Sequence, residues 1–317
     1  MLLTDYDAEY DRKLEKLDKE MYSEIKSHKD VIPGSVCMAL KNGVFAGAGL
    51  LLATPALSAQ FLKDKKKSIK GPEAESEADK NKKTEYYVNG EYKAVPNTEY
   101  EIAVSVGLLD DMKESLKLLK NENKDKKISL RLFCDGEDLA YMEFLMYNGF
   151  KAVGIMPVFT KKIADEEMEN EPENDLAGTG TEEFLSMKEH RELIPEYLKA
   201  YKSAFKSPQS PNEIDFRLSE NSSDIICMIR EGEILGAVSL RQVSKNTAIL
   251  ENLFIGKKFR KQGLASFLMA HIEKVLIEKG FKTMELTVEG DNHPAVRLYM
   301  KNRFELTGTS VIMKYEI

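Results

Sequence analysis

The sequence predicts an α/β fold with a mixed sheet, built from two tandem units. At 317 residues the chain is about twice as long as a typical domain of ~150 residues. Two blocks of the first half recur in the second half in the same order, which indicates an internal duplication. In both halves, short apolar stretches alternate with amphipathic segments of helical period, which is typical of proteins that mix strands and helices.

The duplication is visible in two alignments. Residues 43–51 align with residues 232–240, and four of the nine positions are identical. Residues 130–150 align without a gap with residues 284–304. The identical pairs of this second block are Leu132/Leu286, Gly136/Gly290, Met146/Met300, Asn148/Asn302 and Phe150/Phe304.

Three elements are predicted in the first half. Residues 44–57 form the longest apolar run, which is shorter than the ~18–20 residues of a membrane span, so we expect a buried strand there. Asn89 and Gly90 stand between strand-like residues and predict a hairpin over residues 86–92. The apolar spacing of residues 108–121 predicts a helix.

The second half has the clearer pattern. Its predicted elements are a helix at 181–205, strands at 225–230, 234–243 and 247–255, a helix at 262–279, a strand at 283–288, a helix at 293–302 and a strand at 305–316.

Two polar segments organise the chain. Residues 63–84 are charged and poor in apolar side chains, so we expect an inserted mobile loop. The acidic stretch around residues 163–180 predicts a linker between a first domain at 1–162 and a second at 181–317.

Composition excludes several classes of protein. The net charge of −7 disfavours broad nucleic-acid binding, which needs a concentrated positive surface. Cys37, Cys134 and Cys227 lie far apart and form neither a disulfide framework nor a metal site, so we expect no metal. No export signal and no membrane span is visible, so the chain is expected to be cytoplasmic. The oligomeric state stays open.

One segment carries a chemical pattern. An apolar strand ends near Ile255, a basic loop with Lys257 and Arg260 follows, and an amphipathic helix starts at Gly263. Unpaired N–H groups and a partial positive charge at a helix start attract phosphate groups. On spacing alone, a solvated basic turn is the favoured interpretation of the segment.

Two motifs resemble the GNAT superfamily of N-acetyltransferases. The run from Arg260 through Gly263 to Ala265 matches its signature [Arg/Gln]-x-x-Gly-x-[Gly/Ala]. Residues 292–304 match its downstream Asn-x-x-Ala-x-x-Leu-Tyr-x-x-x-Gly-Phe, except that Arg303 replaces glycine. The resemblance covers residues 181–317 and, through the repeat, more weakly 1–162. It implies two tandem acyl-CoA N-acyltransferase domains.

The resemblance also implies a cofactor site. Acetyl-CoA is expected in a wedge between strands 247–255 and 283–288, with main-chain groups near Phe254 and Ile255 holding its pantetheine and thioester. The expected binding residues are Phe254, Ile255, Arg260, Lys261, Gln262, Gly263, Leu264, Ala265 and Asn292.

Two catalytic residues are expected. Tyr299 resembles the tyrosine that stands near the sulfur of CoA, with a buried core tyrosine as the alternative. A primary amine is almost fully protonated at pH 7, so a base is needed, and Glu251 is the candidate, directly or through water. A surface glutamate on a strand is the equal alternative.

The first half departs from this pattern. Asp110 and Asp111 are expected at the start of its helix, where they would repel a diphosphate. Leu145 stands at the position of Tyr299, and Asp138 at that of Asn292. Residues 1–162 are therefore expected to be a degenerate copy.

The sequence thus predicts an N-acetyltransferase that moves acetyl from acetyl-CoA to the primary amine of a small molecule or peptide. Alternatives are a non-enzymatic acyl-CoA-binding or scaffold protein and a transferase of a longer acyl group.

Overall fold

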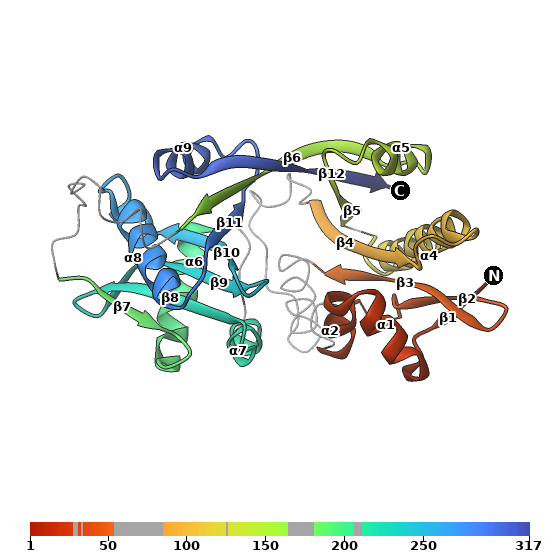
Figure 1. Ribbon diagram of the computed structural model, residues 1–317, viewed down its shortest axis with the longest axis horizontal. Helices are drawn as coiled ribbons and strands as arrows, with labels where there is room; N and C mark the ends of the chain where they lie inside the picture. The colour runs from red at the N-terminus through yellow and green to blue at the C-terminus, as the bar shows by residue number, and fades with distance from the viewer. Residues whose placement is uncertain are drawn as a thin grey trace. The chain divides into compact units, whose positions relative to one another are not determined.

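The computed structural model describes residues 1–27, 31–32, 34–53, 85–124, 126–163, 181–205, 209 and 211–317. The predicted mobile loop at 63–84 and all but the first residue of the predicted linker lie outside the described residues. The chain forms two compact units (Figure 1). Unit 1 comprises Met1–Cys134, Asp138–Val153 and Val311–Ile317, and unit 2 comprises Asp135–Glu137 and Gly154–Ser310.

Unit 1 is a sheet with helices packed on it. Its elements are β1 (Leu2–Asp5), α1 (Asp11–Leu17), α2 (Lys19–Ser27), β2 (Cys37–Lys41), β3 (Val44–Ala53), β4 (Glu85–Ala94), α4 (Glu101–Glu122), β5 (Lys127–Asp135) and α5 (Leu139–Tyr147). Its strands follow the order β1-β2-β3-β4-β5-β12, in which β12 (Glu305–Glu316) is the last strand of the chain. β4 and β5 pair in parallel, and β1 to β4 pair antiparallel, so the sheet is mixed.

Unit 2 repeats this plan. Its elements are β6 (Lys151–Lys162), β7 (Glu183–Ser186), α6 (Ile194–Ala204), α7 (Pro211–Ser219), β8 (Ser223–Arg230), β9 (Glu233–Gln242), β10 (Thr247–Ile255), α8 (Leu264–Glu278), β11 (Thr283–Thr287), α9 (His293–Lys301) and β12 (Glu305–Glu316). Here the order is β6-β11-β10-β9-β8-β7. Only β10 and β11 pair in parallel among these strands.

The units are not contiguous halves of the sequence, because the last strand of each repeat joins the other unit. β6 ends the first repeat, yet its residues 158–162 pair antiparallel with β11 in unit 2. β12 ends the second repeat, yet Val311 and Met313 lie in the core of unit 1 with Leu130 and Leu132. The predicted boundaries at 162 and 181 do not show this exchange, because both strands carry patterns that fit either sheet.

In unit 2 the two faces of the sheet carry separate cores. Leu240, Leu250, Met284 and Leu286 face the helix α8 and the helix α9. The opposite face packs against α6 and α7 and includes Ala237 and Phe254. Figure 1 shows α8 and α6 on opposite sides of these strands.

The structure bears out the internal repeat in its turns and caps. Asn42 and Gly43 join β2 to β3 with positive φ, and Glu231 and Gly232 join β8 to β9 in the same way. Two positive φ angles define the tight turn that matches the twist of a hairpin. The equivalent residues Asn148 and Asn302 both donate from their side-chain amides to the carbonyl four residues earlier, Phe144 and Leu298 respectively.

One expectation about local structure is wrong. Asn89 and Gly90 do not form a hairpin but lie inside β4, opposite Leu52 and Leu51 of β3. A Cβ on Gly90 would lie 2.8 Å from Leu130, so glycine is required here by close packing and not by a turn.

The expected helix at 181–205 is also only partly correct. Residues 183–186 form the edge strand β7, and the helix α6 starts at Ile194. A second helix, α7, follows at Pro211–Ser219, where none was predicted. Pro195 in the first turn of α6 fits a helix start, since that position needs no N–H.

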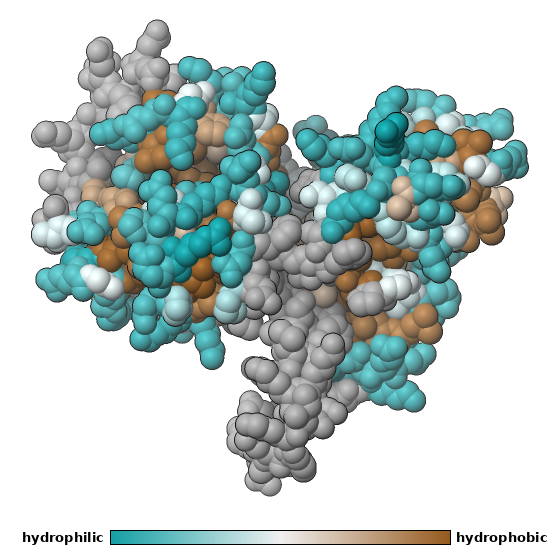
Figure 2. All heavy atoms as spheres, turned by 90° about the horizontal axis from the view of Figure 1, so that it is seen from below, coloured by the Kyte–Doolittle hydropathy of each residue, from teal (hydrophilic) through white to brown (hydrophobic). Residues whose placement is uncertain are grey.

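On the face seen in Figure 2, hydrophilic side chains cover most of the surface of the described residues, with smaller hydrophobic patches between them. Among the helices that the structure describes, none is long and apolar enough to cross a membrane.

Candidate active site

The strands β10 and β11 separate in unit 2, as the wedge predicted from the sequence requires. They pair in parallel at three positions, ending with Ile249 opposite Glu285. Beyond this pair, residues 250–255 of β10 pair only with β9 on their other side. The main-chain groups of β10 that face β11 are therefore open to a ligand over this stretch.

A bulge sits within the open stretch. Glu251 is opposite Ser239 and Phe254 is opposite Ala237, so two residues of β10 face one residue of β9. One of the two is Asn252, which has a φ of 53°. The hydroxyl of Tyr201 on α6 donates to its Oδ1 at 3.4 Å.

The two strand residues predicted to hold the cofactor differ in orientation. Gly256 N–H donates to the carbonyl of Leu235 on β9. Successive residues of a strand direct their main-chain N–H and C=O groups to opposite edges. The main-chain groups of Phe254, like those of Gly256, therefore face β9, and those of Ile255 face the open edge. The structure therefore brings the main chain of Ile255, but not that of Phe254, to the wedge. The ring of Phe254 packs against Tyr197 and Tyr201.

The loop between β10 and α8 forms a cradle of main-chain N–H groups. Lys261 has a φ of 63° and Gly263 a φ of 75°, so two left-handed residues alternate with right-handed or extended ones. Such alternation turns successive N–H groups to one side and makes a concave anion site. Within the described part of the chain, no acceptor is found for the main-chain N–H groups of residues 260–266.

The side chains of the loop hold its shape. Arg260 Nε donates to the carbonyl of Ile255 at 3.0 Å, which ties the loop to the end of β10. Lys258 pairs with Glu233 at 2.5 Å. Lys257 and Lys261 have no ion-pair partner among the residues described, so their charges are available to an anion at the cradle.

Tyr299 lies in the core of unit 2 beside the wedge. It is 8% exposed, and its ring centroid lies 6.0 Å from that of Phe159 and 5.9 Å from that of Phe304. Burial raises the pKa of its phenol to about 12. In the part of the chain that the structure describes, its hydroxyl has no hydrogen-bond partner, so it is free to donate to a ligand.

Glu251 is held by two arginines. Arg217 Nη1 on α7 donates to its Oε2 at 2.5 Å, and Arg241 Nε on β9 donates to its Oε1 at 3.0 Å. Burial on its own would raise the pKa of this carboxyl, but the charges and hydrogen bonds of both arginines outweigh it and hold the pKa below its usual value. This environment suits a permanently charged group better than a proton acceptor.

A second carboxylate beside the wedge was missed by sequence reasoning. Glu285 is the last residue of β11 that pairs with β10, and it is partly exposed. No ion pair or hydrogen bond of its side chain is found among the described residues. The apolar neighbours of Glu285, Met284 and Leu286, both face α8. Because side chains alternate along a strand, this pattern could have placed Glu285 on the opposite face of the sheet.

Asn292 starts the helix α9. Its Oδ1 accepts from the N–H of Ala295 at 3.4 Å, which makes it the N-cap. Asp138 caps α5 in unit 1 in the same way, by accepting from Tyr141 N–H at 2.9 Å. The repeat thus preserves the cap, while Leu145, fully buried, replaces the phenol of Tyr299.

In unit 1 the equivalent wedge contains the protein's own side chains. β4 and β5 pair from Glu85 to Asn89, and β4 then continues without β5. Tyr92 lies on this continuation, and its ring centroid is 6.2 Å from that of Tyr141 on α5. Burial and the neighbouring Tyr141 raise the pKa of Tyr92, and burial raises the pKa of Tyr141.

The start of α4 differs from the expectation. Asp110 and Asp111 are not at a helix start, because α4 begins at Glu101 and they lie in its middle. At the true start, Glu101 Oε2 accepts from the N–H of Asn97 at 2.7 Å. A carboxylate of the chain therefore accepts a main-chain N–H just before this helix start.

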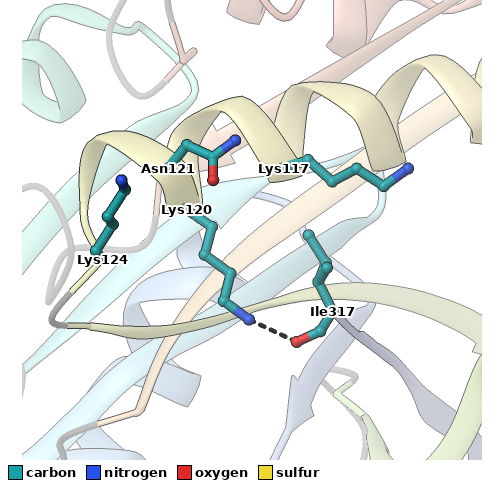
Figure 3. A pocket seen from close by; sticks show the side chains of 5 residues that line it. All are labelled: Lys117, Lys120, Asn121, Lys124 and Ile317. Atoms are coloured by element: carbon teal, nitrogen blue, oxygen red, sulfur yellow. Dashed lines mark hydrogen bonds between the residues drawn. The ribbon is translucent and has the colours of Figure 1, made fainter.

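A basic hollow of about 400 Å³ is a different kind of site. It lies at the end of α4 and is lined by Lys117, Lys120, Asn121, Lys124 and Ile317. Figure 3 shows that the three ammonium groups point in different directions. Lys120 donates to the carbonyl of Ile317 and Lys117 to Glu114, so the hollow does not focus charge on one point.

Comparisons with known proteins agree with this geometry. Residues 190–304 match the model of the acetyltransferase (GNAT) family. An acetyltransferase of Sodalis glossinidius (strain morsitans) is 24% identical over 108 residues, which are 33% of this chain and 75% of that protein. These matches support acyl transfer as the general chemistry.

Solved structures agree in fold across nearly the whole chain. A tandem GNAT protein from the clavulanic acid biosynthesis pathway has a TM-score of 0.64 at 12% identity and covers 99% of this chain and 98% of its own. A GCN5-related N-acetyltransferase of Sphaerobacter thermophilus has a TM-score of 0.62 at 12% identity, with 99% and 95% covered. The stretch that matches the acetyltransferase (GNAT) family model, residues 190–304, contains the wedge, the cradle and Tyr299.

Proposed function

We propose that unit 2 transfers the acetyl group of acetyl-CoA to a primary amine. The observation that carries this proposal is the cradle of free N–H groups at residues 260–266, which lies directly after the open stretch of β10. If the diphosphate of CoA binds at the cradle, its pantetheine arm extends along β10 towards Tyr299. Lys261, Gly263 and the other residues of the signature would bind the diphosphate through their main-chain N–H groups. Lys257 adds positive charge.

Ile255 and Tyr299 supply the groups that the reaction needs. Attack of an amine on the thioester places negative charge on its oxygen, and a fixed N–H donor such as that of Ile255 stabilises this charge. The thiolate of CoA then leaves, and the hydroxyl of Tyr299 donates a hydrogen bond to it.

Tyr299 acts as a hydrogen-bond donor and not as a full acid. Its pKa of about 12 lies above the ~8.5 of a thiol. Complete proton transfer to the thiolate therefore costs roughly 5 kcal/mol at ~1.4 kcal/mol per pKa unit. A hydrogen bond to the charged sulfur avoids this cost and still stabilises the departing group by about 1.5–3 kcal/mol.

The proton of the amine has two candidate acceptors. The sequence suggested Glu251 as the general base, but its two arginine partners lower the pKa of its carboxyl and so its basicity. Glu285 stands across the wedge without a partner among the described residues and is better suited to hold an ammonium ion. We assign the binding of the ammonium group and the acceptance of its proton to Glu285, and Glu251 remains the alternative acceptor, acting through water.

Unit 1 is proposed to be a degenerate copy that binds no acyl-CoA. The tyrosine pair in its wedge and Glu101 at the start of α4 support this reading. The three buried free cysteines fit the reducing environment of the cytoplasm, to which we assign the reaction. The acceptor is a small molecule or peptide amine, and no metal is required.

A matched pair of glycine variants tests the cofactor site. Gly263→Ala and Gly280→Ala both place a side chain at positive φ, 75° and 81°, at the two ends of α8. The backbone penalty, about 1 kcal/mol, is the same in both. We expect Gly263→Ala to weaken CoA binding in calorimetry by about tenfold or more, whereas Gly280→Ala leaves it unchanged. Equal CoA affinity in the two variants contradicts the proposal.

Turnover separates the enzyme from its rival, a non-enzymatic acyl-CoA-binding protein. Release of the CoA thiol is measured with acetyl-CoA and a panel of amines, and with propionyl-CoA and butyryl-CoA to define the acyl group. Tight CoA binding without thiol release for any amine favours the binding protein.

A further inference from the structure

Four charged side chains share one face of the unit 2 sheet beside the wedge. Arg241 is opposite Ile249, which is itself opposite Glu285, so the three residues form one row across β9, β10 and β11. Paired residues point to the same face. Glu251 stands two residues further along β10, on that same face. Arg217 reaches it from α7, which packs on this face.

The charges on this face are separated into two centres. In one centre, Glu251 lies between the guanidinium groups of Arg217 and Arg241, and among the described side chains Glu251 is the only carboxylate that pairs with Arg217. The other centre is the carboxylate of Glu285. Glu251 lies two residues beyond Ile249, the last residue of β10 that pairs with β11, so it stands diagonally to Glu285 where the two strands separate.

The positive centre is accessible. The side chains of Arg217, Glu251 and Arg241 are 22%, 26% and 32% exposed. Arg217 donates to Glu251 through Nη1, and a guanidinium carries five N–H donors in a planar fork that suits a carboxylate. Partial burial strengthens its attraction for an anion relative to a fully solvated arginine.

We propose that the acceptor is a zwitterion of the amino acid class, whose ammonium group faces Glu285 and whose carboxylate reaches Arg217. This inference rests on the proposed acetyl transfer and specifies its substrate. A purely cationic amine would be repelled by the two arginines at this face, and a purely anionic ligand would be repelled by Glu285. A molecule that carries both charges is the electrostatic complement of the pair of centres.

The recognition also serves the reaction. A substrate held at both ends has a fixed orientation, which brings its nitrogen towards the wedge in which the thioester lies. The ammonium of the bound zwitterion transfers its proton to Glu285, directly or through water, before the neutral nitrogen attacks the thioester carbon. The C–S bond breaks, an amide N–C bond forms, and the thiolate leaves with its charge next to Tyr299.

The experiment compares amines with and without a carboxylate, and γ-aminobutyrate and n-butylamine are the matched pair. Rates of CoA thiol release are measured for L-alanine, γ-aminobutyrate, n-butylamine and spermidine with the full chain. We expect at least one of the two zwitterions to have a kcat/KM at least tenfold above that of n-butylamine. A higher kcat/KM for n-butylamine or spermidine overturns the inference but leaves acetyl transfer intact.

Variants of Arg217 test the assigned contact. Arg217→Gln is expected to raise the KM of the preferred zwitterion at least tenfold more than the KM of n-butylamine, and Arg217→Lys is expected to restore part of the loss because it keeps the charge. Arg191→Gln breaks the exposed ion pair of Arg191 with Asp215 and is the matched control. Equal KM changes for both amines overturn the inference.

Two further outcomes are informative. If Arg217→Gln does not fold, Glu285→Gln provides the second test, and it should raise the KM of every amine while the affinity for CoA stays unchanged. Absence of thiol release with all amines, despite CoA binding, overturns the proposed function and the inference together.

Discussion

The ring of Phe159 lies 6.0 Å from the ring of Tyr299, although Phe159 belongs to the last strand of the first repeat and Tyr299 to the last helix of the second. Strand exchange therefore places a residue of the first repeat in the core cluster that contains Tyr299 of the second. β6 also supplies the antiparallel partner of β11. Neither repeat can form its complete core from its own sequence. The surroundings of Tyr299 therefore depend on both repeats.

The first prediction concerns Phe159. It is 3% exposed, and its replacement by alanine is expected to lower the free energy of unfolding by about 3–5 kcal/mol, because a buried ring is removed and a cavity remains. Phe133→Ala is the control, since Phe133 is 41% exposed, and its loss should be below about 1.5 kcal/mol. Urea denaturation measures both values, and a similar loss in the two variants contradicts the assigned packing.

The second prediction concerns Tyr299. Tyr299→Phe keeps the ring and removes the hydroxyl, so we expect the affinity for CoA to change less than twofold and kcat to fall about 10- to 100-fold. Tyr147→Phe, at a position that is 93% exposed, should leave kcat unchanged.

The raised pKa of Tyr299 gives this prediction a signature in pH. The phenol has a pKa of about 12 in the folded chain and ~10 when unfolded. Its contribution to stability is fully present below pH ~10 and is lost as the pH rises through 12. The stability of the wild-type chain should therefore fall more steeply than that of Tyr299→Phe between pH 10 and 12. Parallel curves contradict the burial of the hydroxyl.

The third prediction concerns Glu251. Its carboxyl has a pKa below its usual value, so it stabilises the fold above the unfolded pKa of ~4.3, and this stability is lost as the pH falls through the folded pKa. Glu251→Gln is expected to lower the free energy of unfolding by about 1–3 kcal/mol at pH 7, because two arginines lose a shared partner. The difference should shrink at pH values below about 4.

An exposed glutamate is the control for that measurement. Glu196→Gln removes a side chain that is 62% exposed and pairs with Lys199 at 3.5 Å, so it should change stability by less than about 0.5 kcal/mol at either pH. A difference between wild type and Glu251→Gln that does not depend on pH contradicts the ion-pair account.

The sequence predicted the parts of the fold that local patterns determine. The helix α8, the strands β8 to β12 and the basic loop all lie close to their expected places, since apolar periodicity and turn residues specify them. The exchange of β6 and β12 could not be predicted, because both strands fit either sheet. Likewise, nothing near Glu251 in the sequence names Arg217 as its partner, and that partnership changes the role of the carboxylate.

The fourth prediction concerns Gly90, where sequence reasoning placed a turn. A Cβ at this position lies 2.8 Å from Leu130 and 3.1 Å from Met112 Sδ, so Gly90→Ala is expected to cost about 1–3 kcal/mol. Gly308 in β12 is the matched strand glycine, and there the nearest atom, Val158 Cβ, lies at an ordinary 3.8 Å. Gly308→Ala should leave stability unchanged or raise it slightly. Equal destabilisation in denaturant contradicts the close packing of Gly90.

The last prediction concerns the tyrosine pair of unit 1. Tyr92 and Tyr141 lie where β4 has left β5, and Glu101 accepts a hydrogen bond at the start of α4, so we propose that unit 1 binds no pantetheine arm. Calorimetry with CoA should therefore give a stoichiometry of one per chain, and Gly263→Ala should abolish or weaken that single event. Tyr92→Ala should lower the free energy of unfolding by about 3–5 kcal/mol, since it empties a buried contact. A second CoA bound per chain, with affinity unaffected by Gly263→Ala but lost on changing Tyr92, would show that unit 1 retains its own cofactor site.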